Sequence, residues 1–148
     1  MKILFVCTGN VGRSQIAEAI FNSLTKGKHT AVSAGTRVFD SEGVSQQGQK
    51  LHERESAKEV IESLKKVGFD VSNNQRDQVT KEMAENADRI VVMAEQETIP
   101  DFLINNAKVT LWTIEDPWNK DQQTTDRIRD EITEKVKLLI PELDKQRP

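Results

Sequence analysis

Cysteine and tyrosine are almost missing from this chain, which has one cysteine, Cys7, and no tyrosine among 148 residues. A single cysteine cannot form an internal disulfide, so we expect a reducing compartment and a cytoplasmic protein. No apolar run approaches the roughly 20 residues that cross a bilayer. The apolar part of MKILFVCTGN is short, so we also expect no secretory signal. A disulfide-stabilised or membrane-bound protein is therefore not predicted.

A basic surface is also lacking. The formal net charge is −3, which argues against a general nucleic-acid binder but leaves room for a small positive pocket. His29, His52 and Cys7 have no metal-site spacing, so we expect ordinary surface or rim histidines and no bound metal. No G-x-G-x-x-G motif and no Walker lysine occur, which disfavours a nucleotide-binding loop. Repeats and linkers are absent, and the length suits one domain over residues 1–148.

Apolar patterning predicts strands that alternate with helices. Short apolar runs predict strands at 2–7, 30–34, 89–94 and 108–112. Helical spacing predicts a first helix from Ser14 to a cap at Gly27. Its inner face comprises Ile16, Ala17, Ile20, Phe21 and Leu24.

Three further helices follow the same logic. Ser56 opens a capping box before a helix that ends at Gly68. Its inner side would hold Val60, Ile61, Leu64 and Val67. A short helix is predicted around 80–87. The last helix carries one apolar face, with a disturbance expected at Pro141, and this face comprises Ile128, Ile132, Val136, Leu139 and Leu143.

This order of elements predicts an α/β fold: a parallel sheet covered by helices on both faces. Residues 36–55 are polar and irregular, and a loop of this length is often functional. Sites in such folds lie at the carboxyl ends of the strands. Cys7 stands at that end of the first strand.

The stretch VCTGNVGRSQ at 6–15 has the features of an anion-binding loop. It connects a strand to a helix N-terminus, where free amides and the helix dipole favour negative charge. Gly9 and Gly12 permit backbone conformations closed to other residues, and Asn10 tolerates the left-handed region. Arg13 supplies a planar fork for two phosphate oxygens and favours the thiolate form of Cys7. A buried, inert cysteine is the simpler alternative.

Ser14 has two possible roles in this loop. Its hydroxyl could donate a hydrogen bond to the Cys7 thiolate, or it could cap the helix. Both readings fit the sequence.

The motif VCTGNVGRS is similar to V-C-x-G-N-x-C-R-S, the motif of the low-molecular-weight protein tyrosine phosphatases. Thiol-dependent arsenate reductases share that fold and often continue R-S-Q-M-A-E, which resembles residues 13–18 here. Residues 33–36 and 115–117 also match the family pattern. The resemblance implies a four-stranded parallel sheet in a three-layer α/β/α arrangement and chemistry without a metal or cofactor.

The resemblance also implies roles for individual residues. Cys7 would be the nucleophile, Arg13 the phosphate-holding cation, and Asp116, before Pro117, the general acid. Substrate-binding residues would be Thr8, Gly9, Asn10, Val11, Gly12, Ser14, Phe39 and Trp118. The implied substrate is a phosphotyrosine-containing protein, while phosphate and other tetrahedral oxyanions would also bind. A branched aliphatic residue such as Val11 is typical of tyrosine-specific relatives, whereas arginine phosphatases carry Thr.

Three positions depart from the phosphatase pattern. Gly12 replaces a second loop cysteine, Gln15 replaces the usual Pro, and Asn74 stands where a supporting His is common. Gln15 favours an alternative, arsenate reduction. Thioredoxin-coupled reductases need two further cysteines that this chain lacks, so only a reductase using an external small thiol fits. A non-catalytic phosphate-binding module is a third, weaker interpretation.

Overall fold

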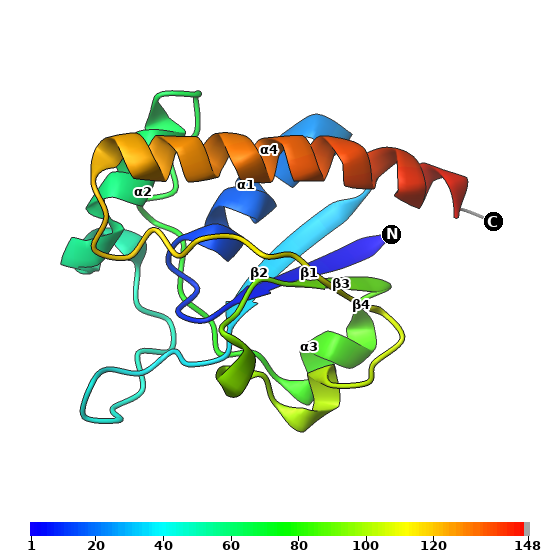
Figure 1. The fold of residues 1–148 in the computed structure, drawn as a ribbon, viewed down its shortest axis with the longest axis horizontal. Coiled ribbons are helices and arrows are strands. Elements are labelled where there is room, and N and C mark those ends of the chain that lie inside the picture. The colour runs from blue at the N-terminus through cyan, green and yellow to red at the C-terminus, as the bar shows by residue number, and fades with distance from the viewer. Residues whose placement is uncertain (147–148) are drawn as a thin grey trace.

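A four-stranded parallel sheet forms the centre of the molecule in the computed structural model, which describes residues 1–146. The strands are β1 (Lys2–Cys7), β2 (Thr30–Gly35), β3 (Arg89–Val92) and β4 (Val109–Leu111). They lie in the order β2-β1-β3-β4, and all three pairings are parallel (Figure 1). The predicted sheet is confirmed, although β3 and β4 are shorter than expected.

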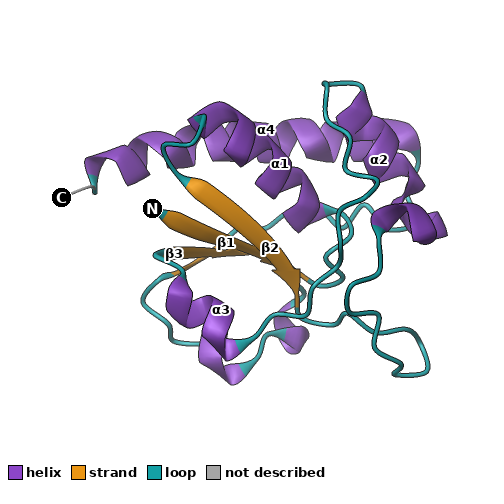
Figure 2. Cartoon of the chain, turned by 180° about the vertical axis from the view of Figure 1, so that it is seen from behind, coloured by secondary structure: helices purple, strands orange, loops and turns teal. Residues whose placement is uncertain are grey.

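Helices cover both faces of this sheet. The α-helices are α1 (Arg13–Thr25), α2 (Lys58–Lys65), α3 (Lys81–Asn86) and α4 (Gln122–Lys145). Three of them, α1, α2 and α4, lie on one face and α3 lies on the other (Figures 1 and 2). The predicted three-layer α/β/α arrangement is therefore confirmed. No helix within residues 1–146 combines the length and apolar character that a bilayer crossing requires.

Strand β1 joins the two halves of the core because its side chains alternate between the faces of the sheet. Ile3, Phe5 and Cys7 belong to the apolar cluster under α1 and α4. Leu4 and Val6 belong to the cluster on the α3 side. All five are at most 2% exposed, so the carboxyl end of β1 is held firmly from both sides.

The predicted inner face of the last helix is buried throughout, and the helix is not interrupted at Pro141. Helix α4 continues through Pro141 to Lys145. Leu139 and Leu143 are buried on either side of Pro141. We attribute the continuity to this packing, which offsets the backbone hydrogen bond that proline cannot make.

Other expectations for the helices were wrong. Leu24 and Val67 are 42% and 45% exposed, so each lies outside the buried face predicted for it. Ser56 is not an N-cap: it lies in a 3₁₀ turn, and α2 begins at Lys58 without a side-chain cap. The end of α1, in contrast, agrees with the prediction: the helix ends at Thr25, and a left-handed Lys26 (φ 49°) is followed by the predicted cap residue Gly27, which has a positive φ of 86°.

His29 is not a surface histidine as predicted, because only 2% of it is exposed. Its Nδ1 lies 2.9 Å from the amino group of Met1, and its Nε2 lies 2.8 Å from Oδ1 of Asp144. Hydrogen bonds from His29, together with Lys28, lower the pKa of Asp144. This contact joins the start of β1 to the end of α4.

The segment predicted as a loop, residues 36–55, is irregular over most of its length. It projects from the carboxyl end of β2, in cyan in Figure 1. A single bridge joins Phe39 to Ser45, and short 3₁₀ turns occupy Leu51–Glu53 and Glu55–Ala57. The loop thus starts and ends beside the strand ends at which the site was predicted.

Candidate active site

The loop of residues 8–12 runs from the last residue of β1, Cys7, to the first residue of α1, Arg13. Neighbouring backbone holds it in place, because Thr36 donates to the carbonyl of Cys7 (2.9 Å) and Arg37 donates to that of Thr8 (2.8 Å). Within residues 1–146, the backbone amides of residues 9–12 have no acceptor. A loop with free amides at a helix N-terminus is suited to bind an anion.

A chain of buried polar side chains supports the thiol. The sulfur of Cys7 lies 3.0 Å from the hydroxyl of Ser14. That hydroxyl accepts a hydrogen bond from Nδ2 of Asn10 (2.7 Å), which also donates to the hydroxyl of Ser33 (3.1 Å). Because Ser14 accepts from Asn10, its own proton is free to be donated to the sulfur. The position of Ser14 beside the sulfur favours the first of its two predicted roles, and α1 has no side-chain cap.

Beyond Ser33 lies Glu18 on α1. Burial raises the pKa of this carboxyl group, and a hydrogen bond from Ser33 acts in the opposite direction. The network thus extends from the sulfur to a partly buried carboxyl group on the far side of the loop.

The conformation of the loop depends on different residues than the sequence suggested. Asn10 is left-handed, as predicted (φ 55°), and its Oδ1 accepts from the amide of Asp77 (2.8 Å). Gly9 and Gly12 do not adopt positive φ, and Gly12 has φ −107° and ψ −88°, outside the helical and extended regions. Space also restricts residue 12, because a Cβ there would lie 2.7 Å from Cγ of Pro117.

Gly35 meets a similar constraint that the sequence did not reveal. A Cβ on Gly35 would lie 2.8 Å from the carbonyl oxygen of Thr8 and 2.9 Å from the amide nitrogen of Asn10. The end of β2 therefore packs directly against the backbone of the loop.

Gln15 and Asn74, two departures from the phosphatase pattern, contact each other. Nδ2 of Asn74 donates to Oε1 of Gln15 (3.2 Å). Nε2 of Gln15 in turn donates to the carbonyl of Asn10 (3.1 Å) and to that of Gln75 (3.2 Å). The pair therefore links the loop to the segment before α3, and the network around Asn10 is intact.

Arg13 is fixed by groups from two other loops. It is 4% exposed, and its Nη1 donates to the carbonyl of Ile114 (3.1 Å). Its Nη2 lies 2.8 Å from Oε1 of Glu95 and 3.6 Å from Oδ2 of Asp116. The role of Glu95 could not be predicted from the sequence. The backbone amide of Glu95 donates a hydrogen bond to the hydroxyl of Thr8 (2.9 Å). The Thr8 side chain thus anchors the loop after β3 instead of pointing freely to a ligand.

Asp116 reaches the same pocket from the loop after β4. Its Oδ1 accepts from the amide of Trp118 (2.9 Å). The pocket has a volume of about 190 Å³, and the predicted residues that line it include Cys7, Thr8, Gly9, Val11, Gly12, Arg13, Phe39, Asp116 and Trp118. Phe39 and Trp118 are 44% and 60% exposed, as walls open to solvent would be. Asn10 and Ser14 are fully buried behind the loop, so their contribution is support.

Three arginines that the sequence analysis did not single out also line this pocket: Arg37, Arg54 and Arg76. Arg76 is 1% exposed, and its Nε donates to the carbonyl of Gly9 (3.0 Å). Burial, followed by the positive charge of Arg54, lowers the pKa of Arg76 to about 10, so it stays charged at neutral pH.

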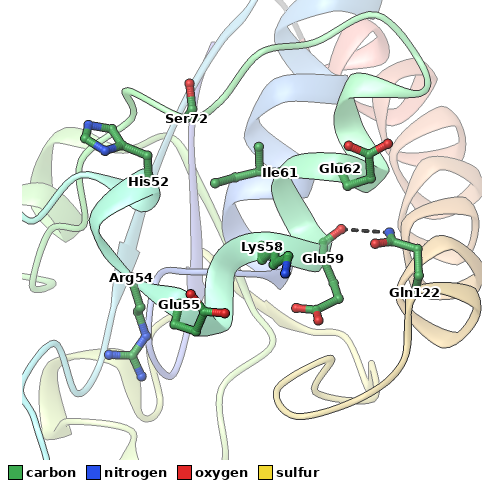
Figure 3. A pocket seen from close by; sticks show the side chains of 9 residues that line it. All are labelled: His52, Arg54, Glu55, Lys58, Glu59, Ile61, Glu62, Ser72 and Gln122. Carbon is green, nitrogen blue, oxygen red and sulfur yellow. Dashed lines mark hydrogen bonds between the residues drawn. The ribbon is translucent and has the colours of Figure 1, made fainter.

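A larger cavity, of about 550 Å³, lies beside α2 (Figure 3). Glu55, Glu59 and Glu62 line it together with Lys58, and Gln122 of α4 donates to the carbonyl of Glu59 there (2.9 Å). None of the predicted site residues lines this cavity. Residues 1–146 contain no cluster of three His, Cys, Asp or Glu side chains suited to a metal ion.

Known proteins with similar sequences include members of one phosphatase family and arsenate reductases. The family model described as low molecular weight phosphotyrosine protein phosphatase matches residues 2–148. Among curated proteins, an arsenate reductase of Staphylococcus aureus (strain Newman) is 30% identical over 131 residues, which are 88% of each chain.

Two solved structures resemble the whole fold. A low molecular weight protein tyrosine phosphatase from T. tengcongensis is 26% identical, with a TM-score of 0.76 over 96% of this chain and 99% of the other. An arginine phosphatase, YwlE, is 25% identical, with a TM-score of 0.80 over 99% and 98%. That structure is of a cysteine-to-serine variant with a phosphorylated active-site serine. The relatives therefore share the fold but differ in the group that they act on.

Proposed function

Because this chain belongs to the low molecular weight phosphotyrosine protein phosphatase family, we propose that it hydrolyses phosphotyrosine in proteins through a phosphocysteine intermediate. One observation carries the proposal: Cys7 and Arg13, at the two ends of one loop, line the same pocket as Asp116 from the loop after β4. Within residues 1–146 the backbone amides of residues 9–12 have no acceptor, which supports the binding of a phosphoryl group at this loop.

The proposed reaction has two steps. In the first, the Cys7 thiolate attacks phosphorus in line, and the P–O bond to the tyrosine ring breaks. Asp116 gives its proton to the leaving phenolate oxygen. In the second step a water molecule attacks the phosphocysteine, Asp116 accepts its proton, and inorganic phosphate leaves with the thiolate restored.

Charge stabilisation comes from groups that are in place before the substrate arrives. Arg13 and the loop amides hold the equatorial oxygens, where negative charge gathers in the transition state. Ser14 donates to the sulfur both in the free enzyme and when the thiolate leaves. Phe39 and Trp118 form the sides of the pocket against which a tyrosine ring can stack.

Substitution of the nucleophile and the acid tests this proposal. Cys7→Ser is expected to abolish turnover of p-nitrophenyl phosphate and of a phosphotyrosine peptide while the far-ultraviolet circular dichroism is unchanged. Asp116→Ala is expected to lower kcat most for substrates with poor leaving groups. Activity that survives in Cys7→Ser, or an equal loss on all leaving groups, would argue against the assignment.

Arsenate reduction by an external thiol is the second candidate. The similarity to staphylococcal arsenate reductases and the presence of Gln15 favour it. Cys7 is the chain's one cysteine, so an arseno-cysteine adduct would need a small thiol from solution. Assays with arsenate and small thiols on the same preparation separate the two. Arsenite release that exceeds phosphatase turnover would favour the reductase.

A further inference from the structure

The pocket around Cys7 is lined by more arginines than the sequence analysis predicted. Four arginines line it, against one carboxylate, Asp116. Arg13 is already paired with Glu95 at 2.8 Å and lies 3.6 Å from Asp116. Within residues 1–146, the other three have no carboxylate within 4.0 Å. This concentration of unpaired cations occurs in a chain whose net charge is −3.

Hydrogen bonding of these arginines is also incomplete. Arg76 uses Nε for the carbonyl of Gly9 and Nη1 for Oε1 of Gln49 (2.7 Å), but its Nη2 donates to no group in the described chain. Nε of Arg54 is buried and has no hydrogen-bond partner among residues 1–146. Buried donors in proteins are nearly always satisfied, so an unpaired guanidinium nitrogen at a pocket points to a missing acceptor.

The three arginines reach the pocket from separate places. Arg37 follows β2 and is exposed, Arg54 precedes α2, and Arg76 lies between α2 and α3. Figure 3 shows the guanidinium of Arg54 pointing away from Ile61 and Glu62 of the neighbouring cavity. Arg54 and Arg76 are near enough for the charge of one to lower the pKa of the other. Two cations held this close favour an anion between or beside them.

From these observations we infer that Arg37, Arg54 and Arg76 form a second anion subsite beside the phosphate loop. The inference rests on the proposed phosphatase function and names its substrate class: a phosphotyrosine segment with an acidic side chain next to the phosphotyrosine. A guanidinium binds a carboxylate or a second phosphate through the same paired donors. The phosphoryl group would bind at residues 8–13 while the neighbouring anion meets the three arginines.

Peptide pairs test the subsite. One pair has glutamates or glutamines beside a single phosphotyrosine, and a second pair has a neighbouring phosphotyrosine or tyrosine in an otherwise neutral sequence. We expect kcat/KM to be about tenfold higher for the acidic member of the first pair, and this preference to shrink as salt is added. A preference only in the second pair would show that the subsite binds a second phosphate. That result would overturn the proposal that it binds an acidic side chain. Equal rates in both pairs would overturn the subsite.

Variants connect the preference to these residues. Arg54→Gln and Arg37→Gln are each expected to lower kcat/KM for the acidic peptide at least fivefold more than for the neutral one. Arg54→Glu should reverse the preference, toward a peptide with lysines beside the phosphotyrosine. Arg89→Gln removes the same charge at the opposite end of the sheet and should keep the preference of the unmodified protein. If Arg54→Glu retains the acidic preference, the subsite is wrong.

The failure of this inference differs from failure of the proposed function. If p-nitrophenyl phosphate is hydrolysed in a Cys7-dependent way but the peptide preference is absent, the subsite is refuted and the phosphatase stands. If no phosphomonoester is hydrolysed by the folded protein, the proposed function fails and the subsite assignment fails with it.

Discussion

The sulfur of Cys7 and the hydroxyl of Ser14 are 3.0 Å apart, and Asn10 donates to that hydroxyl from the other side (2.7 Å). The arrangement orients the Ser14 proton toward the sulfur. A hydrogen bond to a charged group contributes about 1.5–3 kcal/mol. Ser14 is therefore the side chain through which the loop can act on the sulfur of Cys7 most directly.

Ser14→Ala removes this donor. We expect kcat/KM for p-nitrophenyl phosphate to fall about tenfold to a hundredfold, because the thiolate loses one charge-assisted hydrogen bond. Ser23→Ala, at an exposed position of the same helix, is the matched control. A Ser14→Ala variant with the same kcat/KM as the unmodified protein would contradict the assigned hydrogen bond.

Gly12→Ala tests how closely the two catalytic loops approach. A Cβ at residue 12 would lie 2.7 Å from Cγ of Pro117, so the loop that carries Asp116 must shift. We expect kcat to fall by roughly tenfold to a hundredfold, with the greatest loss on poor leaving groups, because misplaced acids catalyse poorly. A Cβ added at Gly9 would have its nearest neighbouring atoms at 3.8 Å, so Gly9→Ala should lower kcat less than Gly12→Ala does. An equal loss in the two variants would show that the contact with Pro117 is unimportant.

Because Gln15 and Asn74 share a hydrogen bond, the effects of substituting them on the free energy of unfolding should not be additive. Gln15→Ala leaves the carbonyl groups of Asn10 and Gln75 without this donor, at a cost of about 1–3 kcal/mol in the free energy of unfolding. In a double-mutant cycle with Asn74→Ala, urea denaturation should give a coupling of about 0.5–1 kcal/mol. Strictly additive losses would indicate that the two side chains act independently.

Asp144 should make the stability of the fold depend on pH in the acidic range. Its pKa is lowered from an ordinary value of 3.8 by hydrogen bonds from His29 and Lys28. A carboxyl group with a lowered folded pKa stabilises the fold above its unfolded pKa, and this contribution disappears as pH falls through the folded pKa. Asp144→Asn should therefore lower Tm at neutral pH but not at pH well below 3.8. Glu142→Gln, an exposed neighbour on α4, should show no such difference.

The sequence predicted the parts of the site that are local or that match a motif. The anion-binding loop spans adjacent residues, so Cys7 and Arg13 could be related by spacing, and the apolar periods located the strands beside them. Asp116 is about a hundred residues away, and only the resemblance to a known family connected it to the loop. The burial of His29 could not be predicted, because its partners lie at the two ends of the chain.

Contacts between distant segments account for what the sequence did not reveal. Glu95 pairs with Arg13 across 82 positions, and Arg76 reaches the carbonyl of Gly9 across 67. No local pattern distinguishes these side chains from other charged residues of the surface. Gly12 was predicted as a special position from its backbone freedom, but the close approach of Pro117 to it could not be seen in the sequence.

The phosphocysteine is the central claim, and trapping it is the most direct test. In Asp116→Ala, a substrate with a good leaving group such as p-nitrophenyl phosphate should still phosphorylate Cys7, while hydrolysis of the adduct slows because the base is missing. Rapid quenching followed by mass spectrometry should then find phosphate on the peptide that contains Cys7, together with a burst of one p-nitrophenolate per enzyme molecule. Steady phosphatase turnover with neither a burst nor phosphate on Cys7 would contradict the mechanism.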